Sequence, residues 1–320
     1  LSFFSLFQDM PIDKEDYIFT IDPHNTTDFD DAVSIKQVGD STRIKIYISN
    51  VAFILNAFNL QDYITNQVAT IYLPHTKINM LSNILATNIC SLVEQTNKFT
   101  IVCTLTIKDN TIIDSCFSNE TVFIHKNYTY DDPDLLSNPH YTLLFDTISS
   151  LTTIHNSHDL IEWLMIEMNF RASIILKEKN IGLFRNNNLI TSSYFLYHEH
   201  ADFSHKMLNK SSYLHITSPI RRIVDILNQI ALIYVLNLHV LSTKSIDFYN
   251  TVSLTVNTIN YYSKKIKYLE SDIYFLTHIS NETSLECTAV VLDHSIYIDK
   301  FNKYMYVKDI HLTHHINTHI

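Results

Sequence analysis

The arrangement of apolar and polar residues along the first 125 residues predicts mainly β-strands. Tyr17–Ile21 is a short β-prone run, Arg43–Ser49 alternates with a period of two, and Phe99–Ile107 alternates over nine positions. Between these runs, Ala57–Thr70 has the spacing of a short helix. The first part of the chain is therefore predicted to be mainly a sheet.

From about Tyr141 onward the apolar residues take the spacing of helices. His158–Lys179 places them three and four positions apart, and similar patterns predict helices over Pro219–Leu238 and Val252–His278. Strands followed by helices are typical of an α+β domain rather than of repeated βαβ units. We therefore predict an α+β fold in which long helices pack on a sheet.

The end of the chain returns to short β-prone runs, which lie at Glu286–Leu292, Ile296–Asp299 and Tyr304–Val307. Such runs look like the opening of a small OB-type β-barrel, but the segment is too short to close one. We therefore predict one large domain over residues 1–284 and an incomplete OB-like segment over residues 285–320.

The composition excludes several classes of protein. Two glycines, Gly39 and Gly182, cannot build the glycine-rich turn of a nicotinamide dehydrogenase, a P-loop NTPase or a kinase-like fold. The most apolar stretch, Ile230–Leu241, has 12 residues against the roughly 18 that a membrane span needs, so we expect no membrane partner. The four cysteines form no CxxC pair and no secretory leader opens the chain, so we expect free thiols and a cytoplasmic location.

Charge is distributed unevenly along the chain. The formal net charge is −10, but residues 1–160 have a balance of −11 and residues 161–320 a balance of +1. Within residues 171–222, eight Lys and Arg residues outnumber three acids. A local basic surface of this kind can bind phosphates on an acidic protein, although a solvated helix surface explains the same charges equally well.

Four aspartates gather where a predicted strand ends. Asp22 closes the apolar run Ile18–Ile21, and Asp28, Asp30 and Asp31 follow within nine residues. Apolar neighbours place the last two near the core, where ionised carboxylates repel one another and take up protons unless a cation is bound. A hard divalent cation such as Mg²⁺ would keep them charged, so we favour a metal site over a solvated turn.

A second segment has the pattern of a helix start. Ser218 is a favourable N-cap and Pro219 a favourable first helical residue. Arg221 and Arg222 would then lie in the first turn, where the helix dipole disfavours cations. A phosphate bound there would reverse that preference, and the simpler alternative is that Asp225 pairs with one of the two arginines.

Together these segments resemble the catalytic domain of the ribonuclease II (RNB) family of 3′-to-5′ exoribonucleases. The family's IDP and DxDDA motifs match Ile21–Pro23 and Asp28–Ala32, and its YxxFTSPIRRYxD motif matches Tyr213–Asp225. Shorter matches keep the family's order along the chain, at Ile71–Pro74, Asn79–Ser82, Asn88–Leu92, Met165–Asn169 and Leu269–Asp272. Several motifs in one register indicate the family more strongly than any one of them alone.

The resemblance implies a hydrolytic enzyme that draws single-stranded RNA into a channel and releases nucleoside 5′-monophosphates. It assigns Asp22, Asp28, Asp30 and Asp31 to Mg²⁺, with Mn²⁺ as a substitute, and makes Asp30 the aspartate most critical for activity. Arg221 would bind the scissile phosphate and stabilise its developing charge.

Further residues are implied to contact the RNA. Tyr72 would stack on the terminal base, Glu270 would lie near the 3′ end, and Arg185 and Arg222 would add positive charge. Arg185 keeps the arginine of the family's RxH element, whereas Asn187 stands where the histidine is usual. Without the resemblance, Tyr72 would be interpreted as an aromatic residue of the core.

The family's flanking RNA-binding modules have no match in these 320 residues, neither the N-terminal cold-shock domains nor a complete C-terminal S1 domain. We therefore expect weak RNA binding from this chain alone, or help from a protein partner or from OB-type domains. Two alternatives to an exoribonuclease stay open. One is a non-catalytic RNB-like RNA-binding scaffold, and the other is a carboxylate–metal phosphoesterase that acts on DNA or small nucleotides.

Overall fold

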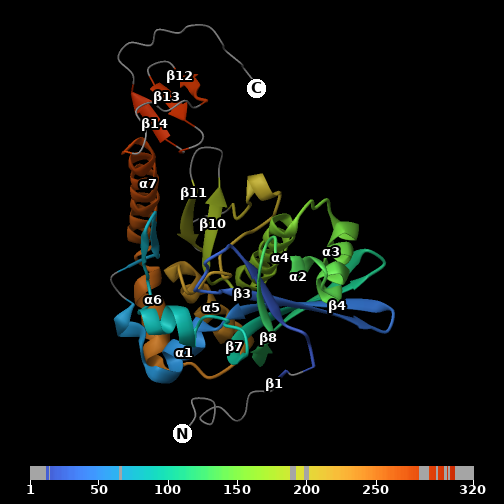
Figure 1. Cartoon of the computed structure of the whole chain (residues 1–320). Coiled ribbons are helices and arrows are strands. Elements are labelled where there is room, and N and C mark those ends of the chain that lie inside the picture. Colours follow the sequence, from blue (N-terminus) through green and yellow to red (C-terminus); the bar gives the residue numbers. More distant parts are fainter. Residues whose placement is uncertain are drawn as a thin grey trace. The chain divides into compact units, whose positions relative to one another are not determined.

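Two units make up the chain (Figure 1). Unit 1 comprises Leu1–Thr70 and Asn79–Tyr261, and unit 2 comprises Ile71–Ile78 and Tyr262–Ile320. The computed structural model describes residues 12–13, 15–64, 67–187, 192–197, 202–280, 288–292, 295–298, 301 and 303–306. All four predicted metal-ligand aspartates belong to unit 1.

A seven-stranded mixed sheet runs through unit 1 in the strand order β1-β8-β7-β4-β3-β2-β9. β1 pairs with β8 and β2 with β9 in parallel, and the other neighbours are antiparallel. The strands are β1 (Ile12–Asp13), β2 (Phe19–Asp22), β3 (Asp31–Val38), β4 (Ser41–Ser49), β7 (Thr96–Lys108), β8 (Thr111–Ile124) and β9 (Lys126–Thr129). The predicted strands Arg43–Ser49 and Phe99–Ile107 are therefore confirmed within β4 and β7, and the predicted run Tyr17–Ile21 overlaps β2, which begins at Phe19.

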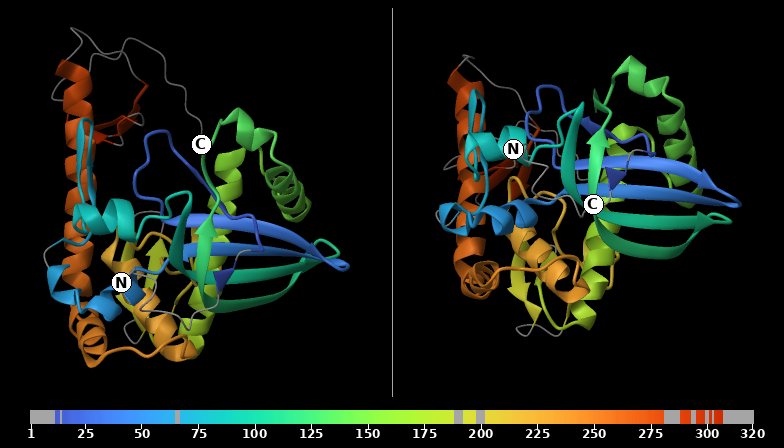
Figure 2. Two further views of the ribbon diagram at one scale, coloured as in Figure 1. Left: turned by 60° about the horizontal axis from the view of Figure 1, so that its bottom comes forward. Right: turned by 90° about the horizontal axis from the view of Figure 1, so that it is seen from below.

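Tight turns set the register of the central strands, which lie side by side in both views of Figure 2. Asp109 and Asn110 join β7 to β8 with φ angles of 49° and 54°. A two-residue hairpin of this kind needs left-handed residues, which Asp and Asn tolerate. Gly39, at φ 62°, provides the same backbone between β3 and β4.

The helices of unit 1 share a core with one face of the sheet. They include α1 (Val51–Phe58), α2 (Pro133–Leu136), α3 (Pro139–Leu151), α4 (Ser157–Glu178), α5 (Ile223–Leu236) and α6 (Thr243–Ser253), and α7 (Val256–Ser280) runs from unit 1 into unit 2. The predicted helix over His158–Lys179 is confirmed as α4, whereas the sequence pattern did not predict α3 or α6. An α+β fold with a mixed sheet and long helices is confirmed. No helix in the described ranges is both long and apolar enough to cross a membrane.

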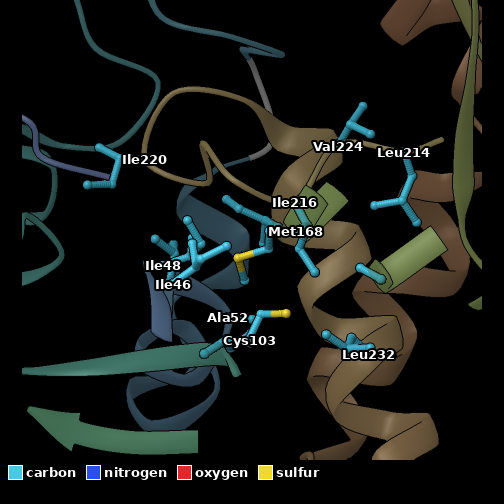
Figure 3. Packing of buried hydrophobic residues seen from close by; sticks show 14 of the residues in the cluster. Ile46, Ile48, Ala52, Cys103, Met168, Leu214, Ile216, Ile220, Val224 and Leu232 are labelled. Atoms are coloured by element: carbon cyan, nitrogen blue, oxygen red, sulfur yellow. The ribbon is translucent and has the colours of Figure 1, made fainter. Parts of the chain in front are cut away.

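Alternation along β4 separates two clusters of buried side chains. Ile46 and Ile48 belong to the main core, and Tyr47 between them belongs to a smaller cluster. Figure 3 shows the main core side with Cys103 of β7 and Met168 of α4 beside the β4 isoleucines. Both faces of β4 are therefore buried, and the period-two pattern of the sequence separates two buried clusters rather than a buried face from a solvent-exposed one.

The prediction of a helix over Ala57–Thr70 is wrong, because the helix in this region, α1, already ends at Phe58. Asn50 caps α1 by accepting a hydrogen bond from the backbone N–H of Phe53 (3.0 Å), and Asn59 ends it with φ 53°. Among the described residues of the predicted range, the end of α1 and a short 3₁₀ turn, Gln61–Tyr63, are helical. The two asparagines were the available signals for a start and a stop.

The helix predicted to begin at Pro219 begins four residues later. α5 starts at Ile223, and Arg222 before it is extended (φ −141°, ψ 128°). The backbone N–H of Thr70 donates to the carbonyl of Arg221 (3.0 Å). This carbonyl is therefore bonded to a neighbouring segment instead of to the next turn of a helix. The residues from Pro219 to Arg221 form a turn instead.

Two short sheets lie in unit 2 together with most of α7. The hairpin consists of β5 (Ile71–Leu73) and β6 (Thr76–Ile78), and the antiparallel sheet of β12 (Val290–Leu292), β13 (Ser295–Ile298) and β14 (Lys303–Tyr306). Phe275 of α7 packs with Ile298 and Phe301. These strands overlap the predicted β-prone runs, of which residues 286–287, 299 and 307 lie outside the described residues. An OB-like tail with a boundary at residue 285 stays a prediction.

In unit 1, a second antiparallel pair stands apart from the large sheet. It consists of β10 (Leu183–Asn187) and β11 (Ser192–Leu196). The carbonyl of Tyr213 accepts a hydrogen bond from the backbone N–H of Arg185 (2.9 Å). β10 therefore lies against the segment that leads to the turn at Pro219.

Candidate active site

The four aspartates lie where β2 ends and β3 begins. Asp22 is the last residue of β2, Asp31 is the first of β3, and Asp28 and Asp30 lie in the connection. Asp30 is buried, and the other three are partly exposed. The four aspartates therefore lie around one strand end, and their role as metal ligands stays a prediction.

Asp30 contacts the turn that carries Arg221. Its Oδ1 accepts a hydrogen bond from the backbone N–H of Ile220 (2.9 Å), 190 residues away, and its Oδ2 lies 3.4 Å from Nε of Arg221. The side chain of Ile220 is buried and anchors the turn (Figure 3). The Arg221 side chain is 46% exposed and that of Asp30 only 5%, so the arginine lies between a buried carboxylate and solvent.

Burial and mutual repulsion hold the aspartates close to protonation. Burial is the largest cause that raises the pKa of Asp22 to about 7 and the pKa of Asp30 and of Asp31 to about 8. Neighbouring aspartates raise each of these pKa values further, and Arg221 lowers all three. The carboxylates are thus close enough to influence one another, and one arginine does not balance them.

The oxygen atoms of this cluster suit a hard divalent cation. Oδ2 of Asp22 is buried and has no hydrogen-bond partner among the described residues. Carboxylate oxygens are the ligands that Mg²⁺ prefers. Within the described ranges, no three His, Cys, Asp or Glu side chains converge closely enough to form a ready metal-binding group. The carboxylates would therefore have to draw closer around a cation.

Arg222 has a different partner from Arg221. Its Nε lies 2.8 Å from Oδ2 of Asp225, and its Nη2 donates to Oδ1 of the same residue (2.9 Å). Asp225 is fully buried and also accepts a hydrogen bond from the backbone N–H of Ser218 (2.7 Å). The pairing with Asp225 is confirmed for Arg222, while Arg221 faces Asp30. This structural role explains Arg222 without RNA, and its RNA contact stays a prediction.

Arg185, on β10, lies among aromatic side chains. Its Nη1 donates to the hydroxyl of Tyr194 (3.3 Å) and lies 3.4 Å from Nδ1 of His215. Its guanidinium also lies 5.5 Å from the centre of the Tyr194 ring. None of these contacts is with a carboxylate.

Tyr72 and Glu270 meet in unit 2. The backbone N–H of Tyr72, on β5, donates to Oε1 of Glu270, on α7 (2.7 Å). The Tyr72 side chain is 43% exposed, so its interpretation as a core aromatic is wrong. The structure thus brings together two of the residues that were predicted to contact RNA.

Three residues around the aspartates carried no role in the sequence analysis. Ser49 and Ser91 are buried, and both form hydrogen bonds with the backbone of the aspartate loop, Thr27–Asp30. Tyr130, just after β9, has its pKa raised to about 12 by burial and by the charges of nearby aspartates. A lone serine or tyrosine has no characteristic spacing, although Ser91 lay inside Asn88–Leu92, a stretch that resembled a family motif.

Comparison with known proteins shows which family part of this chain resembles. Residues 13–140 match the family model of the RNB domain. Exoribonuclease 2 of Aeromonas hydrophila is 26% identical over 117 residues, which cover 36% of this chain and 17% of that protein. The chain therefore spans less than a fifth of the length of this curated relative.

Solved structures share the fold over most of the chain. Mycoplasma genitalium RNase R, in complex with ribose-methylated single-stranded RNA, aligns with a TM-score of 0.76 and 16% identity, covering 93% of this chain and 63% of that one. Yeast Ssd1, described as a pseudonuclease, aligns with a TM-score of 0.64 and 11% identity, covering 80% and 44%. At these identities the likeness shows the fold alone.

The mixed sheet and its helices have the fold of RNB-type structures such as RNase R. The chain is similar to the RNB family, because residues 13–140 match the RNB domain and the relatives named above are RNA-degrading exoribonucleases.

Proposed function

We propose that the chain is a Mg²⁺-dependent exoribonuclease that hydrolyses single-stranded RNA from its 3′ end and releases nucleoside 5′-monophosphates. The observation that carries this proposal is the contact between Nε of Arg221 and Oδ2 of Asp30 at 3.4 Å. It joins a partly exposed cation to a buried carboxylate, Asp30, in a cluster that has too little positive charge of its own. A divalent cation would supply that positive charge, and the cation and Arg221 together could then bind an anionic phosphodiester.

The proposed metal ligands are Asp22, Asp28, Asp30 and Asp31. When bound, the cation acts as a Lewis acid and lowers the pKa of a bound water. Mn²⁺ should replace Mg²⁺ because it accepts the same oxygen ligands. The buried and unpartnered Oδ2 of Asp22 supports this ligand set.

Arg221 is the proposed phosphate ligand. Asp30 holds its Nε, and the hydroxyl of Ser218 accepts a hydrogen bond from its Nη2 (3.0 Å). A guanidinium has five N–H donors, so donors remain for a phosphate oxygen. Held in this way, the arginine can stabilise negative charge that develops on the phosphate during hydrolysis.

Single-stranded RNA is the proposed substrate. The RNase R neighbour was solved with single-stranded RNA, which supports this choice. The exposed ring of Tyr72 can stack on a base of any sequence, and Glu270 fixes the backbone that carries it. OB-type domains or a protein partner would add RNA affinity, and a cytoplasmic location fits such an enzyme.

A second candidate function is a non-catalytic RNA-binding scaffold. The specific observation that favours it is the structural likeness to Ssd1, a pseudonuclease. Retention of four aspartates beside Arg221 favours turnover instead, because clustered carboxylates hinder the binding of an anionic polymer unless a cation is present.

Product analysis tests the proposal. A uniformly labelled single-stranded RNA of about 20–30 nucleotides, long enough to cover several stacked bases, is incubated with the chain and Mg²⁺. Nucleoside 5′-monophosphates should appear from the first time points. Oligonucleotide fragments without mononucleotides would contradict an exonuclease, and RNA binding without any product would favour the scaffold.

A further inference from the structure

One buried hydroxyl bridges the backbone on both sides of Asp28. Ser91 is 0% exposed. Its Oγ accepts a hydrogen bond from the backbone N–H of Phe29 (2.9 Å) and donates one to the carbonyl of Thr27 (3.2 Å). The hydroxyl therefore fixes the peptide groups before and after an aspartate that the proposed function assigns to the cation.

The residues beside Ser91 hold the same loop. The backbone N–H of Leu92 donates to the carbonyl of Phe29 (2.9 Å). The hydroxyl of Ser49 donates to the carbonyl of Cys90, and the backbone N–H of Ser49 donates to the carbonyl of Asp30 (2.9 Å). The aspartate loop is thus tied directly to Ser91, to Leu92 and to Ser49 at the end of β4.

A buried lysine anchors the segment that leads to Ser91. Lys98 of β7 is 6% exposed, and its Nζ donates to the carbonyl of Asn88 in the π-helical turn Leu85–Ile89. Burial lowers the pKa of Lys98 to about 8. A buried ammonium group is costly unless it binds an acceptor, and here the acceptor is backbone just before Cys90. π-helical turns of this kind are frequent beside functional sites.

We propose that Ser91 is a positioning residue for the aspartate cluster, because its hydroxyl fixes the direction in which Asp28 and Asp30 present their carboxylates to a divalent cation. The inference rests on the proposed function. Ser91 touches neither cation nor RNA in this account and acts only through the loop. Hydrogen-bond partners behind metal ligands commonly change metal affinity by about 10- to 100-fold when they are removed.

A serine that matters only for stability gives the matched control. Ser173 of α4 is also 0% exposed, and its Oγ donates to the carbonyl of Phe170 (2.7 Å) and lies 2.7 Å from Oγ of Ser212. Both serines are therefore fully buried and form two hydrogen bonds. Removing either hydroxyl leaves buried polar groups unsatisfied, so both alanine variants should unfold at lower temperature.

The experiment measures Mn²⁺ affinity by electron paramagnetic resonance for the full chain and for Ser91→Ala, Ser91→Cys and Ser173→Ala, beside thermal unfolding and RNA cleavage. Ser91→Ala should bind Mn²⁺ about 10- to 100-fold more weakly and need a correspondingly higher Mn²⁺ concentration for half-maximal cleavage. Ser91→Cys, which keeps a weak donor and acceptor, should lie between Ala and wild type. Ser173→Ala should lose stability but keep the wild-type Mn²⁺ affinity.

The outcomes separate the inference from the proposed function. Wild-type Mn²⁺ affinity in Ser91→Ala, or an equal loss in Ser173→Ala, would overturn the positioning role even if the chain cleaves RNA. If Ser91→Ala does not fold, Ser91→Cys decides, and a wild-type affinity in that variant overturns the role. A wild-type chain that binds Mn²⁺ but does not cleave would overturn the proposed function alone. A wild-type chain that binds no Mn²⁺ would overturn both.

Discussion

A single buried glutamate and the aspartate cluster, both in unit 1, are neutralised by cations to very different extents. Glu167 of α4, 4% exposed, has two cations: Arg171 Nη2 lies 3.2 Å from its Oε2, and Lys210 donates to its Oε1. In the aspartate cluster, Asp30 and its neighbours share Arg221, whose side chain is almost half exposed.

The difference separates a structural ion pair from a candidate site. A buried carboxylate that holds two cations needs nothing further, and its removal would leave unpaired charge. A cluster whose carboxylates raise one another's pKa lacks a cation, and such perturbed groups are more frequent at functional sites. The excess of negative charge beside Asp22, Asp30 and Asp31 is therefore the feature that the proposed Mg²⁺ explains.

The largest expected effect on RNA cleavage comes from replacing Asp30, and Glu167 provides the matched comparison. Asp30→Asn should abolish RNA cleavage, because the amide cannot serve as an anionic metal ligand, while RNA affinity in EDTA stays near the wild-type value. Glu167→Gln should lower the unfolding temperature yet cleave RNA at close to the wild-type rate below that temperature. Cleavage assays and thermal unfolding check both variants. Substantial cleavage by Asp30→Asn would remove that residue from the chemistry.

The two neighbouring arginines sharpen the same contrast. Arg221→Ala should slow cleavage by about 100- to 1,000-fold, as expected for loss of one group that stabilises developing charge. The free energy of unfolding should change little, because the side chain is half exposed. Single-turnover kinetics checks the rate. An unchanged rate would leave the contact with Asp30 as the whole role of Arg221.

Arg222→Ala should instead act on stability. Its loss leaves the fully buried Asp225 without a cation, which costs about 3 kcal/mol of the free energy of unfolding. Denaturant titration measures this value, and cleavage by the folded fraction should persist. A variant that is as stable as wild type but weak in RNA binding would favour the predicted RNA contact over the structural one.

A smaller effect is expected in unit 2. Tyr72→Ala should weaken RNA binding by about 1–3 kcal/mol, the usual value for one base stacked on an aromatic ring. Tyr72→Phe is the control, because it keeps the ring and the backbone hydrogen bond to Glu270. Fluorescence anisotropy with labelled RNA measures both. Equal affinity in all three proteins would exclude stacking on Tyr72.

The smallest effect is a shift of stability with pH. The pKa values of about 7 to 8 in the folded cluster exceed the ordinary value of 3.8, so the folded state holds more protons than the unfolded state between roughly pH 4 and 8. The cluster therefore lowers the free energy of unfolding as pH rises through this range. In EDTA at pH 8.5, Asp31→Asn should unfold a few degrees above wild type, and the difference should vanish near pH 4. A lower unfolding temperature for Asp31→Asn at pH 8.5 would contradict the raised pKa.

Local signals in the sequence predicted much of the fold and of the site. Alternation predicted β4 and β7, a short β-prone run predicted β2, and the abrupt change to Asp22 marked the strand end around which the aspartates lie. These features depend on neighbours in the chain. A pattern of residue types can therefore report them.

Features that depend on distant residues could not be read from the pattern. The start of α5 moved because Thr70 pairs with the backbone of Arg221, and the roles of the two arginines separated because Asp30 lies 190 residues before Ile220. The position of Ser91 behind the aspartate loop has the same origin. The Mg²⁺ requirement and the cytoplasmic location stay predictions.

Cleavage of a 5′-labelled single-stranded RNA by the wild-type chain, in Mg²⁺ and in EDTA beside DNA of the same sequence, tests the central claim most directly. The account predicts a ladder that shortens from the 3′ end in Mg²⁺ only, with the DNA left intact. RNA that stays uncut in Mg²⁺ although the chain binds it, or equal cleavage in EDTA, would contradict a metal-dependent site at the aspartate cluster.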